Sequence, residues 1–376
     1  MKQFKKSVLA AGIAAILPGL SLAATTGPTL GDVFKNSGVT INGYVDTSYT
    51  YLTGAGTFTG GAQDRVYDRE RNSFNLHAID LSVGYLPTSG FGAFTQLDFG
   101  SDANVSASAG SGASDEFDIQ QAYVQYAAGP LTVIGGKFAT LAGAEVITSP
   151  SNLNFTRSIL FGYAIPFTHT GVRATYAIGD AYKVMLGVNN GWDVLRTSQA
   201  STSHTVDGKT LELGASLNPI KPLTITVAGY YGEAVDTTGN SGGLREVLDV
   251  VATYNITDDL SVAFNFDMGD QKDALVVGQK AKWSGEAAYV NWKFAKQWRA
   301  AFRVESFDDK DGYRTGVAGG QVWKEGTATL AYLASDNAEI RLEGRYDKSD
   351  VKAFNMTDGT TKDNQSSVGI EAIYKF

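Results

Sequence analysis

Much of the chain consists of segments in which apolar and polar residues alternate one by one. Phe302 and Val304, for example, alternate with Arg303 and Glu305. A period of two residues indicates a β-strand with one apolar and one polar face. The segments are about ten residues long, which suits a tilted strand that crosses a bilayer. Sixteen strands are predicted, near residues 39–52, 75–86, 91–100, 117–127, 131–140, 168–178, 181–192, 210–217, 223–232, 244–255, 260–268, 282–294, 297–307, 321–333, 337–347 and 365–376.

The connections between these strands alternate between short and long. Gly179-Asp180 is a short turn, whereas Ser101 to Glu116 is a long polar loop. Strict alternation puts all long loops at one end of the sheet, with short periplasmic turns at the other. In the hydrocarbon of a membrane, an unpaired backbone N–H or C=O group is very unfavourable. A sheet that faces lipid must therefore close on itself so that it has no open edge. The sequence therefore predicts an all-β protein, a closed antiparallel up-and-down transmembrane β-barrel.

Aromatic residues decide which face of the strands meets lipid. Alternation by itself leaves a soluble β-sandwich with an apolar interior open. Rings gather at predicted strand ends, as transmembrane barrels place them at the two membrane interfaces: Tyr85, Phe91, Phe99, Tyr126, Tyr254, Trp292, Phe294, Trp298, Phe307 and Phe376. This distribution favours apolar residues outside and a polar lumen inside. A barrel of about sixteen strands is wide enough to enclose water.

The first residues have the composition of a secretory signal peptide. Three lysines precede an apolar stretch from Val8 to Leu17, and Ser21-Leu22-Ala23 offers small residues for cleavage. We expect residues 1–23 to be the signal peptide, 24–38 a short periplasmic segment and 39–376 the barrel. The chain has no cysteine and a formal net charge of -8, which argues against nucleic-acid partners.

The connection from about Ala139 to Phe167 is too apolar for a freely solvated outer loop. We expect it to fold into the barrel and narrow the pore. Charged side chains at a constriction set the selectivity of a wide pore. Candidates lie on this loop and at the strand positions that alternation directs to the lumen: Glu145, Arg157, Arg173, Arg299, Arg303, Arg341 and Arg345. The alternative interpretation is that the charged wall residues form ion pairs that only keep the lumen polar.

Several segments resemble the β-barrel porin family of the OmpL-like type. The sharpest matches are Gln121-Ala122-Tyr123-Val124, Gly136-Lys137-Phe138-Ala139-Thr140, Asn154-Phe155-Thr156-Arg157-Ser158 and Ile165-Pro166-Phe167-Thr168-His169-Thr170-Gly171-Val172-Arg173. The resemblance covers most of the mature chain and implies an outer-membrane porin. It brings no substrate and no catalytic residues. The terminal Phe376 is similar to the aromatic residue that barrel-assembly machinery reads in outer-membrane proteins.

Enzymatic and metal chemistry have little support in the sequence. Of the three histidines, only His169 lies near the predicted constriction, and a hydrogen-bonded structural histidine is the favoured interpretation. No histidine pair has zinc-site spacing, and Asp309-Lys310-Asp311-Gly312 lacks the later glutamate of a calcium loop. We expect no enzyme activity, cofactor or metal.

The prediction is a bacterial outer-membrane porin for passive diffusion of small polar or charged solutes. The alternative is a barrel that does not transport and serves as an adhesin or structural surface protein. Expected partners are outer-membrane lipids, lipopolysaccharide, small hydrophilic solutes and, through Phe376, the assembly machinery. A homotrimer and a monomer both stay open, because lipid-facing and subunit-facing strands have similar patterns.

Overall fold

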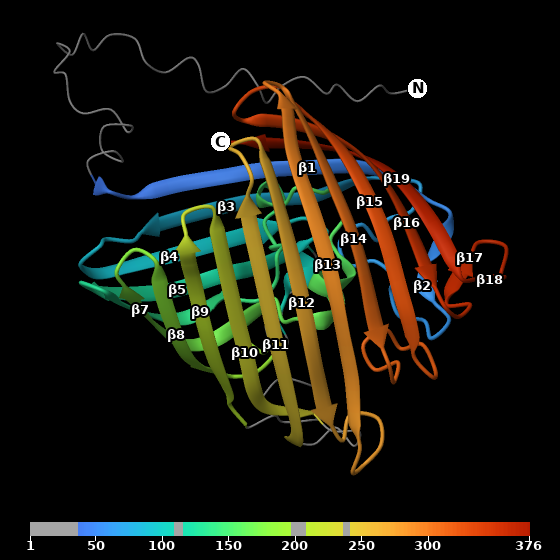
Figure 1. Ribbon diagram of the computed structural model, residues 1–376, viewed down its shortest axis with the longest axis horizontal. Coiled ribbons are helices and arrows are strands. Elements are labelled where there is room, and N and C mark those ends of the chain that lie inside the picture. The colour runs from blue at the N-terminus through green and yellow to red at the C-terminus, as the bar shows by residue number, and fades with distance from the viewer. Residues whose placement is uncertain (1–36, 109–115, 197–207, 236–240) are drawn as a thin grey trace, which may run out of the picture. The chain divides into compact units, whose positions relative to one another are not determined.

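Sixteen antiparallel strands close into a barrel in the computed structural model, which describes residues 37–108, 116–196, 208–235 and 241–376 (Figure 1). The predicted strand number and closure are confirmed, and β1 pairs with β19 to seal the wall. The predicted signal peptide and nearly all of the segment 24–38 lie outside the described residues. The barrel strands are β1 (Thr40–Leu52), β3 (Ser73–Tyr85), β4 (Gly90–Phe99), β5 (Phe117–Ala128), β6 (Leu131–Ala139), β7 (Thr168–Ile178), β8 (Tyr182–Asn189), β9 (Thr210–Ile220), β10 (Leu223–Val235), β11 (Ser241–Asn255), β12 (Leu260–Lys272), β13 (Lys280–Ala295), β14 (Trp298–Asp309), β15 (Gln321–Leu333), β16 (Ala338–Ser349) and β19 (Asn364–Lys375).

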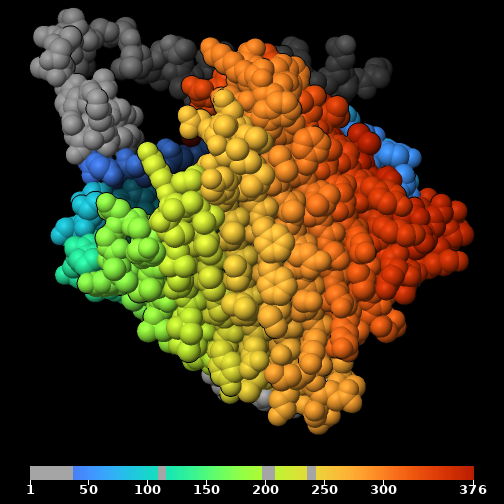
Figure 2. All heavy atoms as spheres, in the orientation of Figure 1, coloured from blue at the N-terminus to red at the C-terminus, as the bar shows by residue number. Residues whose placement is uncertain are grey.

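The period-two pattern places polar residues inside the barrel and apolar residues outside. On β14, Arg303 is fully buried while its neighbours Phe302 and Val304 are 48% and 60% exposed. Since successive side chains of a strand point to opposite faces, the exposed apolar residues form the lipid-facing surface. Figure 2 shows one side of this surface, where strands β9 to β15 form a continuous wall. No helix among the described residues has the length and apolarity needed to cross a membrane.

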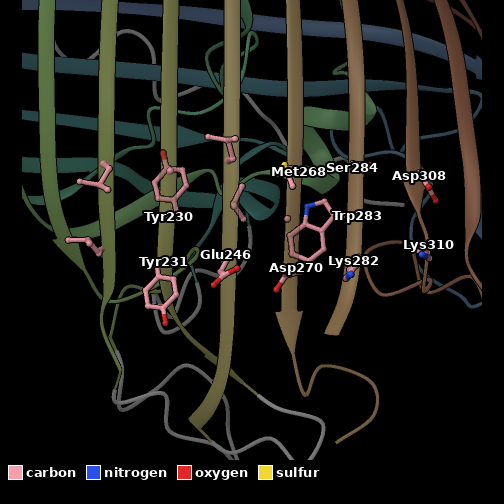
Figure 3. Close-up of a pocket in the computed structure, with 16 residues that line it drawn as sticks. Tyr230, Tyr231, Glu246, Met268, Asp270, Lys282, Trp283, Ser284, Asp308 and Lys310 are labelled. Atoms are coloured by element: carbon pink, nitrogen blue, oxygen red, sulfur yellow. The ribbon is translucent and has the colours of Figure 1, made fainter. Parts of the chain in front are cut away.

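The apolar outer surface ends in charged residues toward the long-loop end of strands β10 to β14. Figure 3 shows Tyr231, Glu246, Asp270, Lys282 and Lys310 in a row across these strands. Together with Leu213, Leu248 and Met268 they line a shallow hollow of about 580 Å³. The change from apolar to charged side chains marks the level at which the barrel leaves the hydrocarbon.

Several short elements lie outside the barrel wall and were not predicted. Strands β2 (Gly54–Phe58), β17 (Phe354–Met356) and β18 (Thr361–Lys362) form a small separate sheet. A single helical turn, α2 (Ala103–Ser106), follows β4, while η1 (Ser149–Ser151) and η2 (Leu160–Ala164) lie between β6 and β7. These elements belong to the long connections, where the sequence shows no alternation.

Candidate channel constriction

The connection between β6 and β7, residues 140–167, folds into the barrel interior as its apolar composition predicts. Ile159, Leu160 and Ile165 are at most 1% exposed and belong to the main hydrophobic cluster, together with Trp283 of β13. The indole of Trp283 donates a hydrogen bond to the Ala164 carbonyl at 3.1 Å. We call residues 140–167 the constriction loop, because they fill part of the lumen where they pack against Trp283 of the wall.

Small residues in the wall give the apolar side chains of the constriction loop room to dock. A Cβ at Gly285 of β13 would lie 2.8 Å from Leu160 Cδ1, and one at Gly369 of β19 would lie 2.8 Å from Phe155 Cε1. Carbon atoms pack without strain at about 3.5–4.0 Å. Larger residues at these two positions would therefore push the loop off the wall.

The wall arginines hold the main chain of the constriction loop. Each of the five predicted pore arginines that belong to the wall donates a hydrogen bond to a carbonyl oxygen in or next to the loop. The distances are 2.7 Å for Arg303 to Thr156, 2.7 Å for Arg345 to Arg157, 2.8 Å for Arg341 to Asn152, 3.3 Å for Arg299 to Leu153 and 3.1 Å for Arg173 to Ala139. Irregular backbone needs partners wherever it is buried. The structure thus brings all five side chains together on one structural element.

Two wall glutamates complement the arginines by accepting hydrogen bonds from loop amides. Glu343 of β16 accepts from the N–H groups of Phe155 at 2.7 Å and Thr156 at 3.0 Å. Glu305 of β14 accepts from Ile159 at 2.7 Å and Leu160 at 3.1 Å. Carboxylate-to-amide bonds are charge-assisted and stronger than neutral ones. Carbonyls and amides of the same loop are therefore both fixed by the wall.

Glu145 and Arg157, the two candidates on the loop itself, are also buried. Glu145 accepts from the Ser158 amide at 2.6 Å and from the Arg303 guanidinium at 2.7 Å. Arg157 donates to the carbonyl oxygens of Ile147 at 2.7 Å and Phe155 at 3.0 Å. Glu145 therefore links the loop to the wall, whereas Arg157 ties two parts of the loop to each other.

A second inserted segment, residues 59–72, was not predicted to enter the barrel. Arg65 bonds Asp347 of β16 at 2.6 Å, and the Tyr67 ring lies 4.8 Å from the Arg157 guanidinium carbon. Burial raises the pKa of Asp64 to about 7, against the opposing effect of Arg65. The isolated Arg65-Val66-Tyr67 run within a polar, glycine-rich loop was the only sequence signal for this insertion.

An aspartate after β8 fixes the end of the constriction loop. The carboxylate of Asp193 accepts hydrogen bonds from the amides of Phe167 and Thr168, both at 2.8 Å. Burial raises the pKa of Asp193 to about 6, while these two amides oppose the shift. Sequence reasoning missed this residue because it lies in a polar connection.

The histidines form two buried polar clusters. His77 contacts Ser48 Oγ at 2.7 Å and Asp102 Oδ1 at 2.8 Å, an arrangement that resembles a hydrolase triad. Ser48 is only 5% exposed, and its strand β1 pairs on both sides, with β3 and β19, so nearby main-chain amides are engaged in the ladder. The cluster therefore connects two strands to the loop after β4. His169 is 1% exposed, near the Gly191 carbonyl at 3.2 Å.

Open volume remains on the periplasmic side of the constriction loop. A hollow of about 410 Å³ lies between the ends of β1, β3 and β19 and the loop residues Thr148 and Pro150. A smaller one of about 130 Å³ separates loop residues 144–154 from the wall around Thr253 and Tyr289. Side chains that line these hollows are mostly neutral and polar, such as Ser82, Gln96 and Ser261.

A closed sixteen-stranded barrel with an apolar outside and a loop folded into its lumen defines the class of outer-membrane porins. The chain belongs to the family described as "Putative beta-barrel porin-2, OmpL-like", whose profile matches residues 38–376. It is accordingly a porin, a channel of the bacterial outer membrane. No curated protein sequence matches the chain at a significant level.

Solved structures share this fold at low sequence identity. The outer membrane channel DcaP of Acinetobacter baumannii is 14% identical with a TM-score of 0.61, over 90% of this chain and 97% of that chain. The anion-selective porin from Comamonas acidovorans is 12% identical with a TM-score of 0.62, over 90% and 99%. A trimer form of OmpT from Vibrio cholerae is 12% identical with a TM-score of 0.59, over 90% and 99%. At this identity the likeness concerns the fold.

Proposed function

We propose that this porin passes small polar or charged solutes by passive diffusion, and that the constriction loop sets their size limit. The observation that carries this proposal is the clamp of wall arginines and glutamates on the loop main chain. Glu145, Arg157, Arg173, Arg299, Arg303, Arg341 and Arg345 shape the pore by fixing the position of the loop.

Conductance in planar bilayers tests the proposal directly. Purified protein should give discrete current steps, and neutral polymers of increasing size should define an exclusion limit. A folded, heat-modifiable barrel that gives no current would assign the chain to the alternative, a surface protein that does not transport.

We infer a homotrimer from two observations on the described residues. The barrel wall is lowest over β6 and β8, with 9 and 8 residues, and tallest over β13 with 16. Outward residues at the low wall are apolar and exposed, such as Val124 of β5 at 62% and Leu186 of β8 at 54%. A partner copy would cover them. Native mass measurement in detergent should give three copies, and a mass of one copy would refute the assembly.

A further inference from the structure

The long-loop mouth of the barrel contains a cluster of arginines and aromatic rings that the clamp does not use. Arg245 comes from the inner face of β11, Trp283 from the inner face of β13, and Trp192, Tyr313 and Arg314 from the loops after β8 and β14. All five are inside the barrel or in loops at the same end. Arg314 Nε also donates to the carbonyl of Tyr163 in the constriction loop, at 2.5 Å. The cluster therefore lies directly against the outer side of the constriction.

Both arginines stack on the same ring system. The guanidinium carbons of Arg245 and Arg314 lie 4.6 Å and 4.7 Å from the centre of the Trp192 ring. The guanidinium carbon of Arg314 also lies 5.4 Å from the centre of the Trp283 ring. Stacking holds a guanidinium by its face and leaves its N–H edge free to bind an anion.

Neither arginine has a carboxylate ion pair among the described residues, unlike those of the clamp. Arg245 donates only to neutral acceptors, Gln271 Oε1 at 2.7 Å and Tyr313 Oη at 2.9 Å. The two Nη groups of Arg314 have no hydrogen-bond partner in the described part of the chain. Burial and the neighbouring charge of Arg245 lower the pKa of Arg314 to about 10, so it stays protonated at neutral pH.

We infer that this cluster, the mouth site, binds small oxyanions, namely carboxylate- or phosphate-bearing solutes, before they pass the constriction loop. Planar guanidinium edges match the geometry of carboxylate and phosphate oxygens. The two guanidinium groups have no direct carboxylate ion pair among the described residues, although Asp193 and Asp309 lie nearby, and they attract such solutes and repel cations. The inference deepens the proposed porin function, since it names the class of solute that the channel favours.

The first test measures zero-current potentials and current block by succinate and by inorganic phosphate in planar bilayers. Wild-type protein should prefer anions, and Arg245→Gln and Arg314→Gln should each reduce that preference by roughly threefold. Lys183→Gln is the matched control, because Lys183 is an exposed lysine at the opposite, periplasmic end of β8, on its lumen-facing parity. Variants that conduct with unchanged anion preference and block would overturn the mouth site. Block by only one of the two probes would assign the site to that oxyanion.

The second test does not require conduction. Tryptophan fluorescence of the detergent-solubilised full chain should change on titration with succinate or phosphate at constant ionic strength, and Trp192→Phe should reduce that signal, with Trp283 as the second reporter in the site. Loss of one charged donor should weaken binding about tenfold in either arginine variant. A fluorescence response without conductance would sink the porin proposal and keep the binding site. Conductance without a fluorescence response, and with no effect of either arginine variant, would refute the binding site and keep the porin proposal.

Discussion

Replacing Arg303 with methionine should detach the constriction loop while leaving the barrel intact. Arg303 is fully buried and contacts Glu145 and Glu325 at 2.7 Å each, besides the Thr156 carbonyl. Methionine fills much of the space but donates nothing. Glu145 would then remain buried without its counter-ion, and Glu325 would keep only Arg345, at 3.5 Å.

The magnitude follows from the cost of an unpaired buried charge. Removing one partner of a buried ion pair costs about 3–5 kcal/mol, mostly because the other charge is left uncompensated. At 1.4 kcal/mol per factor of ten, the ratio of docked to undocked loop would fall by about two to three and a half orders of magnitude. The barrel itself should persist, since its strands are held by main-chain ladders in which the Arg303 side chain takes no part.

Single-channel recording is the assay. The Arg303→Met variant should show a larger or noisier conductance and a higher size limit for neutral polymers, with heat modifiability retained. Glu343→Gln, which weakens two amide contacts of the loop, should shift both quantities in the same direction by less. Lys183→Met provides a control away from the loop. Unchanged conductance, noise and size limit in Arg303→Met would refute the clamp.

Three further results are expected. Gly369→Val should displace Phe155 of the constriction loop and enlarge the conductance, whereas Gly344→Val, where a Cβ has open space, should not; polymer exclusion measures both. Because burial raises the pKa of Asp64 to about 7, the folded barrel keeps a proton that the unfolded chain loses above its ordinary pKa of 3.8. Stability should therefore fall between about pH 4 and 7 and level off above, and thermal unfolding in detergent should show that Asp64→Asn makes this slope shallower; the raised pKa of Asp193 contributes to the slope that remains. Phe376→Ser should reduce the amount of assembled barrel in outer-membrane fractions, and an unchanged amount would exclude recognition of the terminal ring.

The barrel could be predicted because a period of two residues reports directly which face of a strand meets lipid. The ends of strands were less accessible. The strand predicted at 260–268 continues to Lys272, because polar residues extend the ladder above the membrane where hydropathy no longer discriminates. Strands β2, β17 and β18 were missed because they have only five, three and two residues, too few to show a period.

The candidate pore residues illustrate a second limit. The alternation along the strands predicted that the side chains of Arg303 and Arg345 face the lumen. The apolar composition of residues 139–167 predicted that this loop folds into the barrel. Neither pattern gives the height of a side chain along the barrel, which depends on strand register and on the path of the loop. The contact between Glu145 and Arg303 joins positions 158 residues apart. It could only be found in the folded structure.

The contacts of the constriction loop explain why the charged residues that hold the loop differ from those that select solutes by charge. A loop inside a barrel has main-chain groups that no ladder satisfies, so the wall must supply donors and acceptors of both kinds. Arg303 and Arg341 meet this need together with Glu305 and Glu343, and their charges are compensated on the spot. They therefore contribute little net field to the pore. Selectivity then falls to charged groups next to the loop that make no direct ion pair, and Arg245 meets that condition among the described residues.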